Sequence, residues 1–125
     1  MRYVDGFVVP VPKRNVKAYL RMTRRLSRLW MEHGALAYME CAGDNLGVKG
    51  LVTFPRLAKL KRGETVFFSY TVYKSKADRD RVNKKVTADP RMKMQLQKLP
   101  FDMRRTAYGG FKAVVDIERQ TQRAN

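Results

Sequence analysis

The sequence predicts a single α+β domain in which one antiparallel sheet carries helices on one face. Segments rich in β-branched and aromatic residues alternate along the chain with segments whose apolar residues recur every three or four positions. The 125 residues include 44% hydrophobic side chains, which is enough for a core at a length typical of one domain. We expect the domain to span residues 1–118, with a polar tail at residues 119–125.

The first half of the chain predicts a strand, a helix and a second strand. Residues 3–9, YVDGFVV, are rich in β-forming side chains and are followed by two prolines. From Val16 the apolar spacing is that of an amphipathic helix, with Asn15 as the expected N-cap and Gly34 as the stop. Residues 35–42 alternate loosely in polarity before a Gly-Asp-Asn turn, which indicates a second strand.

The second half predicts a long connection, a central strand, two helices and a last strand. The connection runs to about Gly63, and residues 65–73 form the densest aromatic and β-branched run in the chain. A helix is expected over residues 75–88, which open with capping-box spacing, and a shorter one over residues 89–99, which open with Asp-Pro. Residues 106–118 are expected to form a long last strand.

The resulting order, β-α-β-β-α-β, is the split βαβ arrangement of ferredoxin-like domains, which places both helices on one face of an antiparallel sheet. The predicted strands carry large side chains at successive positions, as at Phe67 and Phe68, so both sheet faces are apolar. Since the helices cover only one face, we expect the other to be buried against a second copy of the chain.

Seven short segments carry a resemblance to a known family. They are YVDGFVV at 3–9, EHGAL at 32–36, EC at 40–41, FSY at 68–70, DPRM at 89–92, PFD at 100–102 and YGGF at 108–111. With these segments in this order over nearly the whole chain, the sequence resembles the YbaA-like family of small domains of unknown function, placed among the dimeric α+β barrels. The resemblance implies a homodimer whose two sheets close into a barrel. Related proteins include cofactor-independent oxygenases, heme-degrading enzymes and ligand binders, so no particular reaction is implied.

A pocket between the sheet and the helices is the first candidate site, and a small organic molecule is its expected ligand. If the protein is an enzyme, we expect chemistry without a cofactor, with His33 as general acid or base and Glu40 as its electrostatic partner. Ser69, Tyr73 and Tyr108 are the expected ligand contacts. The alternative is that these side chains are structural, with His33 at a helix end, Glu40 paired with an arginine, and the tyrosines in the core.

The charge of the chain predicts a second candidate site. Lysine and arginine outnumber acidic residues 27 to 11, giving a net charge of +16. Five cations lie on the predicted first helix: Lys17, Arg21, Arg24, Arg25 and Arg28. This face predicts binding of nucleic acid or another polyanion, non-specific at low salt. A solvated helix face without a function, or a cationic engineered scaffold without catalytic activity, accounts for the same pattern.

The single cysteine and single histidine limit other kinds of chemistry. Cys41 has no partner for an internal disulfide, and no His/Cys cluster has metal-ligand spacing, so we expect no metal site. A cysteine in mid-strand is more typical of a core than of a nucleophile. The sequence contains neither a signal-peptide pattern nor an apolar run long enough to span a membrane, so we expect a cytoplasmic protein.

Overall fold

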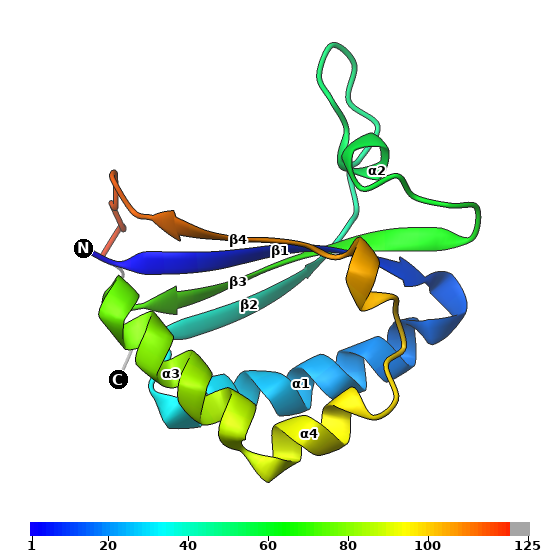
Figure 1. Ribbon diagram of the computed structural model, residues 1–125. Coiled ribbons are helices and arrows are strands. Elements are labelled where there is room, and N and C mark those ends of the chain that lie inside the picture. Colours follow the sequence, from blue (N-terminus) through cyan, green and yellow to red (C-terminus); the bar gives the residue numbers. More distant parts are fainter. Residues whose placement is uncertain (121–125) are drawn as a thin grey trace.

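The computed structural model describes residues 1–120 as an antiparallel sheet with helices layered on one face (Figure 1). The elements are β1 (Tyr3–Pro12), α1 (Val16–His33), β2 (Ala37–Ala42), α2 (Phe54–Leu57), β3 (Glu64–Tyr73), α3 (Lys76–Ala88), α4 (Pro90–Leu96) and β4 (Ala107–Lys112), with 3-10 turns at Lys13–Asn15 and Met103–Arg105. The strand order is β2-β3-β1-β4, and all neighbours are antiparallel. This topology confirms the ferredoxin-like α+β fold.

The core lies between the sheet and α1. Strands β1 and β3 pair along their whole lengths, from Tyr3 opposite Tyr73 to Pro12 opposite Glu64. Because strand side chains alternate between faces, every second residue of both strands points towards the helices. The main cluster is formed by Val9, Val11, Tyr19, Met22, Leu26, Leu29 and Phe67. A smaller cluster under α3 contains Ala35, Tyr73, Val82 and Val86.

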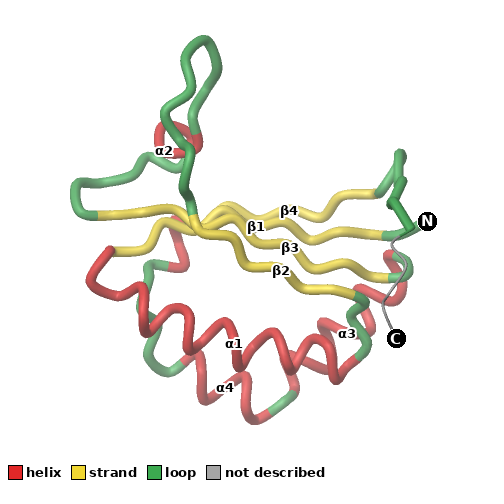
Figure 2. Tube along the Cα trace, turned by 180° about the vertical axis from the view of Figure 1, so that it is seen from behind, coloured by secondary structure: helices red, strands yellow, loops and turns green. Residues whose placement is uncertain are grey.

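Helices α1, α3 and α4 all lie on one side of the sheet, and only the short α2 lies on the opposite side, as Figure 2 shows from behind. Phe68 and Phe111 on this open face are 44% and 62% exposed. Residues 43–63, which we call the arm, include α2 and project from the sheet on the same side (Figure 1). The arm contacts the open face through Phe54, whose ring lies 6.2 Å from that of Phe68. Arm and open face therefore form one exposed apolar surface.

Three predicted boundaries are wrong. The first strand continues through both prolines to Pro12 instead of ending at residue 9. The last strand ends at Lys112 instead of residue 118, because Lys112 pairs with Tyr3, the first residue of β1. Beyond this pair the Ala113 backbone N–H donates to the Arg2 carbonyl at 3.0 Å. Helix α4 ends at Leu96 instead of residue 99. Asn15 occupies the expected N-cap position of α1, but its side chain makes no cap hydrogen bond and donates from Nδ2 to the Pro100 carbonyl, at 2.9 Å. Of the predicted tail, residues 121–125 lie outside the described residues.

The predicted stop of the first helix is confirmed. Gly34 has a φ of 119° and its backbone N–H donates to carbonyls in the last turn of α1. A left-handed residue at this position favours glycine, which has no Cβ to clash with the helix. The turn directs the chain from α1 into β2, whose side chains form one wall of the candidate site.

Candidate functional site

A cavity of about 350 Å³ lies between the helix-facing side of the sheet and the helices. Its walls come from all four strands, from α1 and α4, and from the chain between α4 and β4. The lining residues are Phe7, Val9, Tyr19, Met22, Thr23, Leu26, Trp30, Tyr38, Ser69, Thr71, Met92, Leu96, Leu99, Phe101, Met103, Thr106 and Tyr108. None of these seventeen side chains carries a formal charge at neutral pH, although the chain as a whole has a net charge of +16.

A half-buried carboxyl group, that of Glu40, lies behind the phenol groups of the cavity wall. The Tyr19 hydroxyl donates to Oε2 of Glu40 at 2.8 Å, and the Tyr38 hydroxyl donates to Oε1 at 3.1 Å. Burial raises the pKa of Glu40 above its ordinary value, although both phenol hydrogen bonds act in the opposite direction. Burial also raises the pKa of each phenol, and the Glu40 charge adds to that effect. The phenols are therefore proton donors between the cavity and the carboxylate.

A second buried acid, Asp5, lies behind Tyr108. Asp5 is 1% exposed, and its Oδ1 accepts a hydrogen bond of 3.1 Å from the Tyr108 hydroxyl. Asn83 donates to Oδ2 at 3.4 Å, and the guanidinium of Arg79 lies 3.7 Å from Oδ1. Burial, followed by the charge of Asp5, raises the pKa of Tyr108. Asp5 therefore orients Tyr108 at the cavity wall.

The cavity wall also has an unused hydrogen-bonding group. The hydroxyl Oγ1 of Thr106 is buried and has no partner among the described residues, and Thr106 lines the cavity. Since a buried polar group without a partner is costly, a ligand hydroxyl or carbonyl in the cavity would satisfy it.

Comparison with known proteins places this fold and cavity in a family. The family model described as "Protein of unknown function (DUF1428)" matches residues 2–103. The chain belongs to the DUF1428 family. Relatives of this DUF1428 chain include the uncharacterized protein YbaA of Escherichia coli K12 and of Shigella flexneri. Each is 40% identical over 116 residues, covering 93% of this chain and 99% of the relative. The resemblance to the YbaA-like family is thus confirmed.

Solved structures resemble the DUF1428 chain in fold. One is SnoaB, a cofactor-independent oxygenase from Streptomyces nogalater, with a TM-score of 0.62 and 9% identity over 94% of this chain and 98% of that one. Another is a dimeric ferredoxin-like protein from an uncultured marine organism, with a TM-score of 0.62 and 10% identity over 95% of this chain and 93% of that one. At these identities the likeness establishes the ferredoxin-like fold and no shared chemistry.

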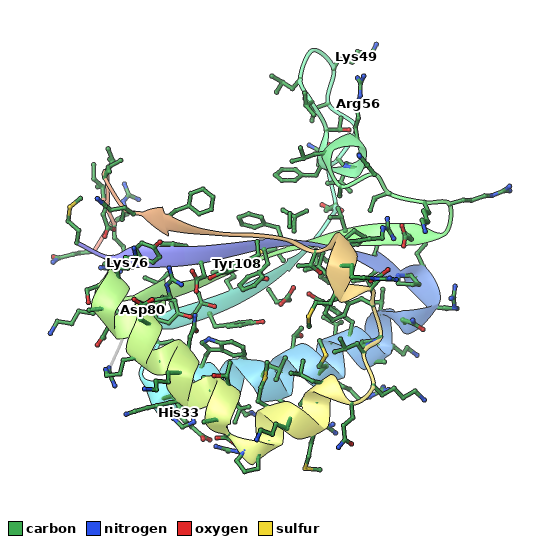
Figure 3. All side chains as sticks on the ribbon, in the orientation of Figure 1. His33, Lys49, Arg56, Lys76, Asp80 and Tyr108 are labelled. Carbon is green, nitrogen blue, oxygen red and sulfur yellow. The ribbon has the colours of Figure 1, made fainter. Side chains whose placement is uncertain are left out.

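The ligand contacts expected from the DUF1428 sequence lie in different places. Ser69 and Tyr108 line the cavity, and Figure 3 shows Tyr108 between the sheet and the helix layer. Tyr73 does not line it, because its side chain is fully buried in the cluster under α3 and its hydroxyl donates to Oδ1 of Asn83 at 3.0 Å. The sequence analysis did not identify Asp5 as a site residue. Its position as the one acid in the apolar first strand could have indicated a buried carboxylate.

The structure gives His33 and Glu40, which were expected to act together, different partners. His33 is the last residue of α1, and its Nε2 lies 3.0 Å from Oδ2 of Asp89 at the start of α4. Asp89 also caps α4 by accepting a 2.9 Å hydrogen bond from the Arg91 backbone N–H. Hydrogen bonds from Arg91, and then from His33, hold the pKa of Asp89 well below its usual range. His33 thus connects α1 with α4 and does not line the cavity. Glu40 is instead hydrogen-bonded to the phenols of Tyr19 and Tyr38.

The cationic residues expected on the first helix are all exposed on α1: Lys17, Arg21, Arg24, Arg25 and Arg28.

Cys41 is half-buried in β2, opposite Phe68 of β3. Within residues 1–120, no three His, Cys, Asp or Glu side chains gather as they would around a metal ion. In the same part of the chain, no helix combines the length and the apolar character needed to cross a membrane.

Proposed function

We propose that the protein binds a small, neutral, largely aromatic organic molecule in the cavity beneath the sheet. The observation that carries this proposal is the uncharged lining of seventeen residues in a chain with a net charge of +16. An ionised ligand would lose its hydration without gaining a counter-ion at the cavity wall. The volume of about 350 Å³ lies within the usual range of ligand pockets, roughly 300–1,000 Å³.

The side chains at the cavity wall define the ligand further. Six of the lining residues are aromatic and three are methionines, so the wall offers ring contacts together with adaptable apolar surface. The free Oγ1 of Thr106 and the hydroxyl of Ser69 are polar groups at the same wall. A planar molecule with one or two hydroxyl or carbonyl groups fits this combination.

Conversion of the ligand would use Glu40 as the proton acceptor. Tyr19 lines the cavity and donates its phenol proton to Glu40 at 2.8 Å. A ligand hydroxyl could pass a proton to the Tyr19 oxygen while the Tyr19 proton moves to the Glu40 carboxylate, which leaves the phenol neutral. Burial raises the Glu40 pKa and so brings the carboxyl closer to the range in which general bases work.

We also propose that a second copy of the chain covers the open face. Phe68 and Phe111 are exposed there, and the arm extends the apolar surface. Large exposed apolar patches are typical of protein interfaces. The dimeric ferredoxin-like protein of the same fold supports self-association through this architecture.

The test of the ligand proposal compares uncharged and charged molecules of one shape. We expect 2-naphthol to raise the melting temperature at pH 7, and 2-naphthoate to have little effect. Met103→Trp, at an exposed position of the cavity wall, should block entry and abolish the 2-naphthol effect. Met31→Trp is the matched control, because Met31 is similarly exposed on α1 outside the cavity. Equal effects of both molecules, or of both variants, would overturn the proposal.

A further inference from the structure

The outer side of the helix layer has two adjoining hollows along α1. The first, of about 440 Å³, is lined by Arg21 and Arg25 of α1 and by Lys98 from the chain after α4. The second, of about 480 Å³, is lined by Arg25, Arg28 and Arg91. Because Arg25 belongs to both, the hollows form one continuous groove between α1 and α4, which we call the basic groove. It adjoins the ligand cavity, with which its first hollow shares Met22 and Leu99.

Four of the five cations that line the basic groove have no acidic partner among the described residues. Arg21, Arg25, Arg28 and Lys98 form no ion pair with any described residue. The one acid lining the groove, Glu32, is bound to Arg91 at 2.7 Å. Like charges spaced three or four residues apart on a helix repel one another. A bound anion would remove that repulsion.

Several other arginines of the molecule are neutralised locally. Arg81 pairs with Asp78 at 2.8 Å, Arg104 with Asp102 at 3.2 Å, and Arg2 with Asp116 at 3.2 Å. Four of the five cations of the basic groove, by contrast, keep their charges free. Unpaired cations also lie elsewhere on the surface, but in the basic groove they line a hollow.

We propose that the basic groove binds the phosphate backbone of a nucleic acid without reading its bases. Arg21, Arg25 and Arg28 form a row about 10 Å long on α1, at roughly 1.5 Å per residue, which suits successive phosphates better than one compact anion. The guanidinium fork matches phosphate oxygens. No aromatic side chain lines either hollow, so the groove lacks the stacking platforms that single-strand binders use for bases.

The experiment measures the salt dependence of binding to a fluorescein-labelled duplex DNA by anisotropy. The test variant is Arg21→Gln/Arg25→Gln/Lys98→Gln. The matched control, Arg56→Gln/Arg62→Gln/Lys74→Gln, removes the same charge from exposed residues outside the groove. Glutamine and arginine have similar helix propensities, so both variants should fold. Circular dichroism and light scattering verify that.

We expect log affinity to fall linearly with log salt, with a slope that weakens by about 0.9 for each phosphate contact removed. The test variant should therefore lose about 2.7 from the magnitude of the slope, whereas the control should keep the slope of the parent. An equal loss of slope in both variants would show that binding depends only on the net charge of the protein, and would overturn the proposal. Equally tight binding of poly-glutamate would also overturn it, because the groove would then select acidic polymers in general.

Discussion

The Tyr19 hydroxyl donates a 2.8 Å hydrogen bond to Glu40 and thereby connects α1 with β2 at the wall of the ligand cavity. Tyr19 is held from two further sides, because its ring centre lies 4.7 Å from that of Phe67 and 5.6 Å from that of Phe101. A residue that lines the cavity is thus hydrogen-bonded to a half-buried carboxylate. This relationship makes both stability and any proton transfer sensitive to Glu40.

The charge of Glu40 should make the stability of the fold depend on pH. Burial raises its pKa above the ordinary value of 4.5. A carboxyl with a raised folded-state pKa stabilises the fold below its unfolded pKa, and this contribution is lost as the pH rises through the folded pKa. Glu40→Gln removes the titration, so its melting temperature should rise relative to that of the parent from about pH 4.5 upwards.

Glu32→Gln is the control for this titration, because its effect on stability should depend on pH in the opposite direction. Hydrogen bonding to Arg91 lowers the pKa of Glu32, so Glu32 stabilises the fold above its unfolded pKa, and the contribution is lost in acid. Thermal unfolding of both variants between about pH 4 and pH 8 measures the two trends. A melting-temperature difference between Glu40→Gln and the parent that stays constant over this interval would contradict the assignment.

Removal of the Tyr19 hydroxyl should destabilise the protein through Glu40. Tyr19→Phe leaves the carboxylate with one phenol donor in place of two, and we expect a loss of about 1–3 kcal/mol in the free energy of unfolding. The same change in a Glu40→Gln background should cost less, because the remaining amide is uncharged. Urea unfolding of the two single variants and the double variant gives the coupling energy. Strictly additive losses would show that the hydrogen bond contributes nothing.

His33 should matter for helix packing and not for the ligand. His33→Ala removes the 3.0 Å contact with Asp89, so the melting temperature should fall while the affinity for 2-naphthol stays unchanged. Tyr108→Phe should lower the affinity for 2-naphthol, since Tyr108 lines the cavity and its hydroxyl is directed by Asp5. Calorimetric titration of both variants tests the contrast. A large loss of affinity in His33→Ala would contradict this prediction and show that His33 contributes to ligand binding.

A charge on the open face should dissociate the proposed dimer. Phe68 is 44% exposed and contacts the arm through Phe54. In Phe68→Glu the buried charge would have no partner at the interface, so light scattering should report the monomer mass, about half that of the parent. Met31→Glu, on α1 in the helix layer, should keep the parent mass. A monomeric parent protein would refute the proposed dimer outright.

The sequence by itself determined which segments form strands and helices, where the first helix stops, and to which family the chain belongs. These features depend on patterns that span a few residues: the density of β-branched side chains at residues 65–73, the helical spacing after Val16, and the glycine at position 34. The order of these elements was enough to predict the ferredoxin-like sheet. Each inference used only local preferences and the known ways of packing such elements.

The tertiary structure alone decided which polar side chains meet. Strand β4 ends where Lys112 pairs with Tyr3. The direction of the last turn of α1 places His33 in contact with Asp89, whereas Glu40 is hydrogen-bonded to Tyr19. The uncharged lining of the cavity likewise combines residues from opposite ends of the chain. The physical reason is that hydrogen bonds and charges act over a few ångströms, so their partners depend on strand register and helix orientation, which sequence spacing does not specify.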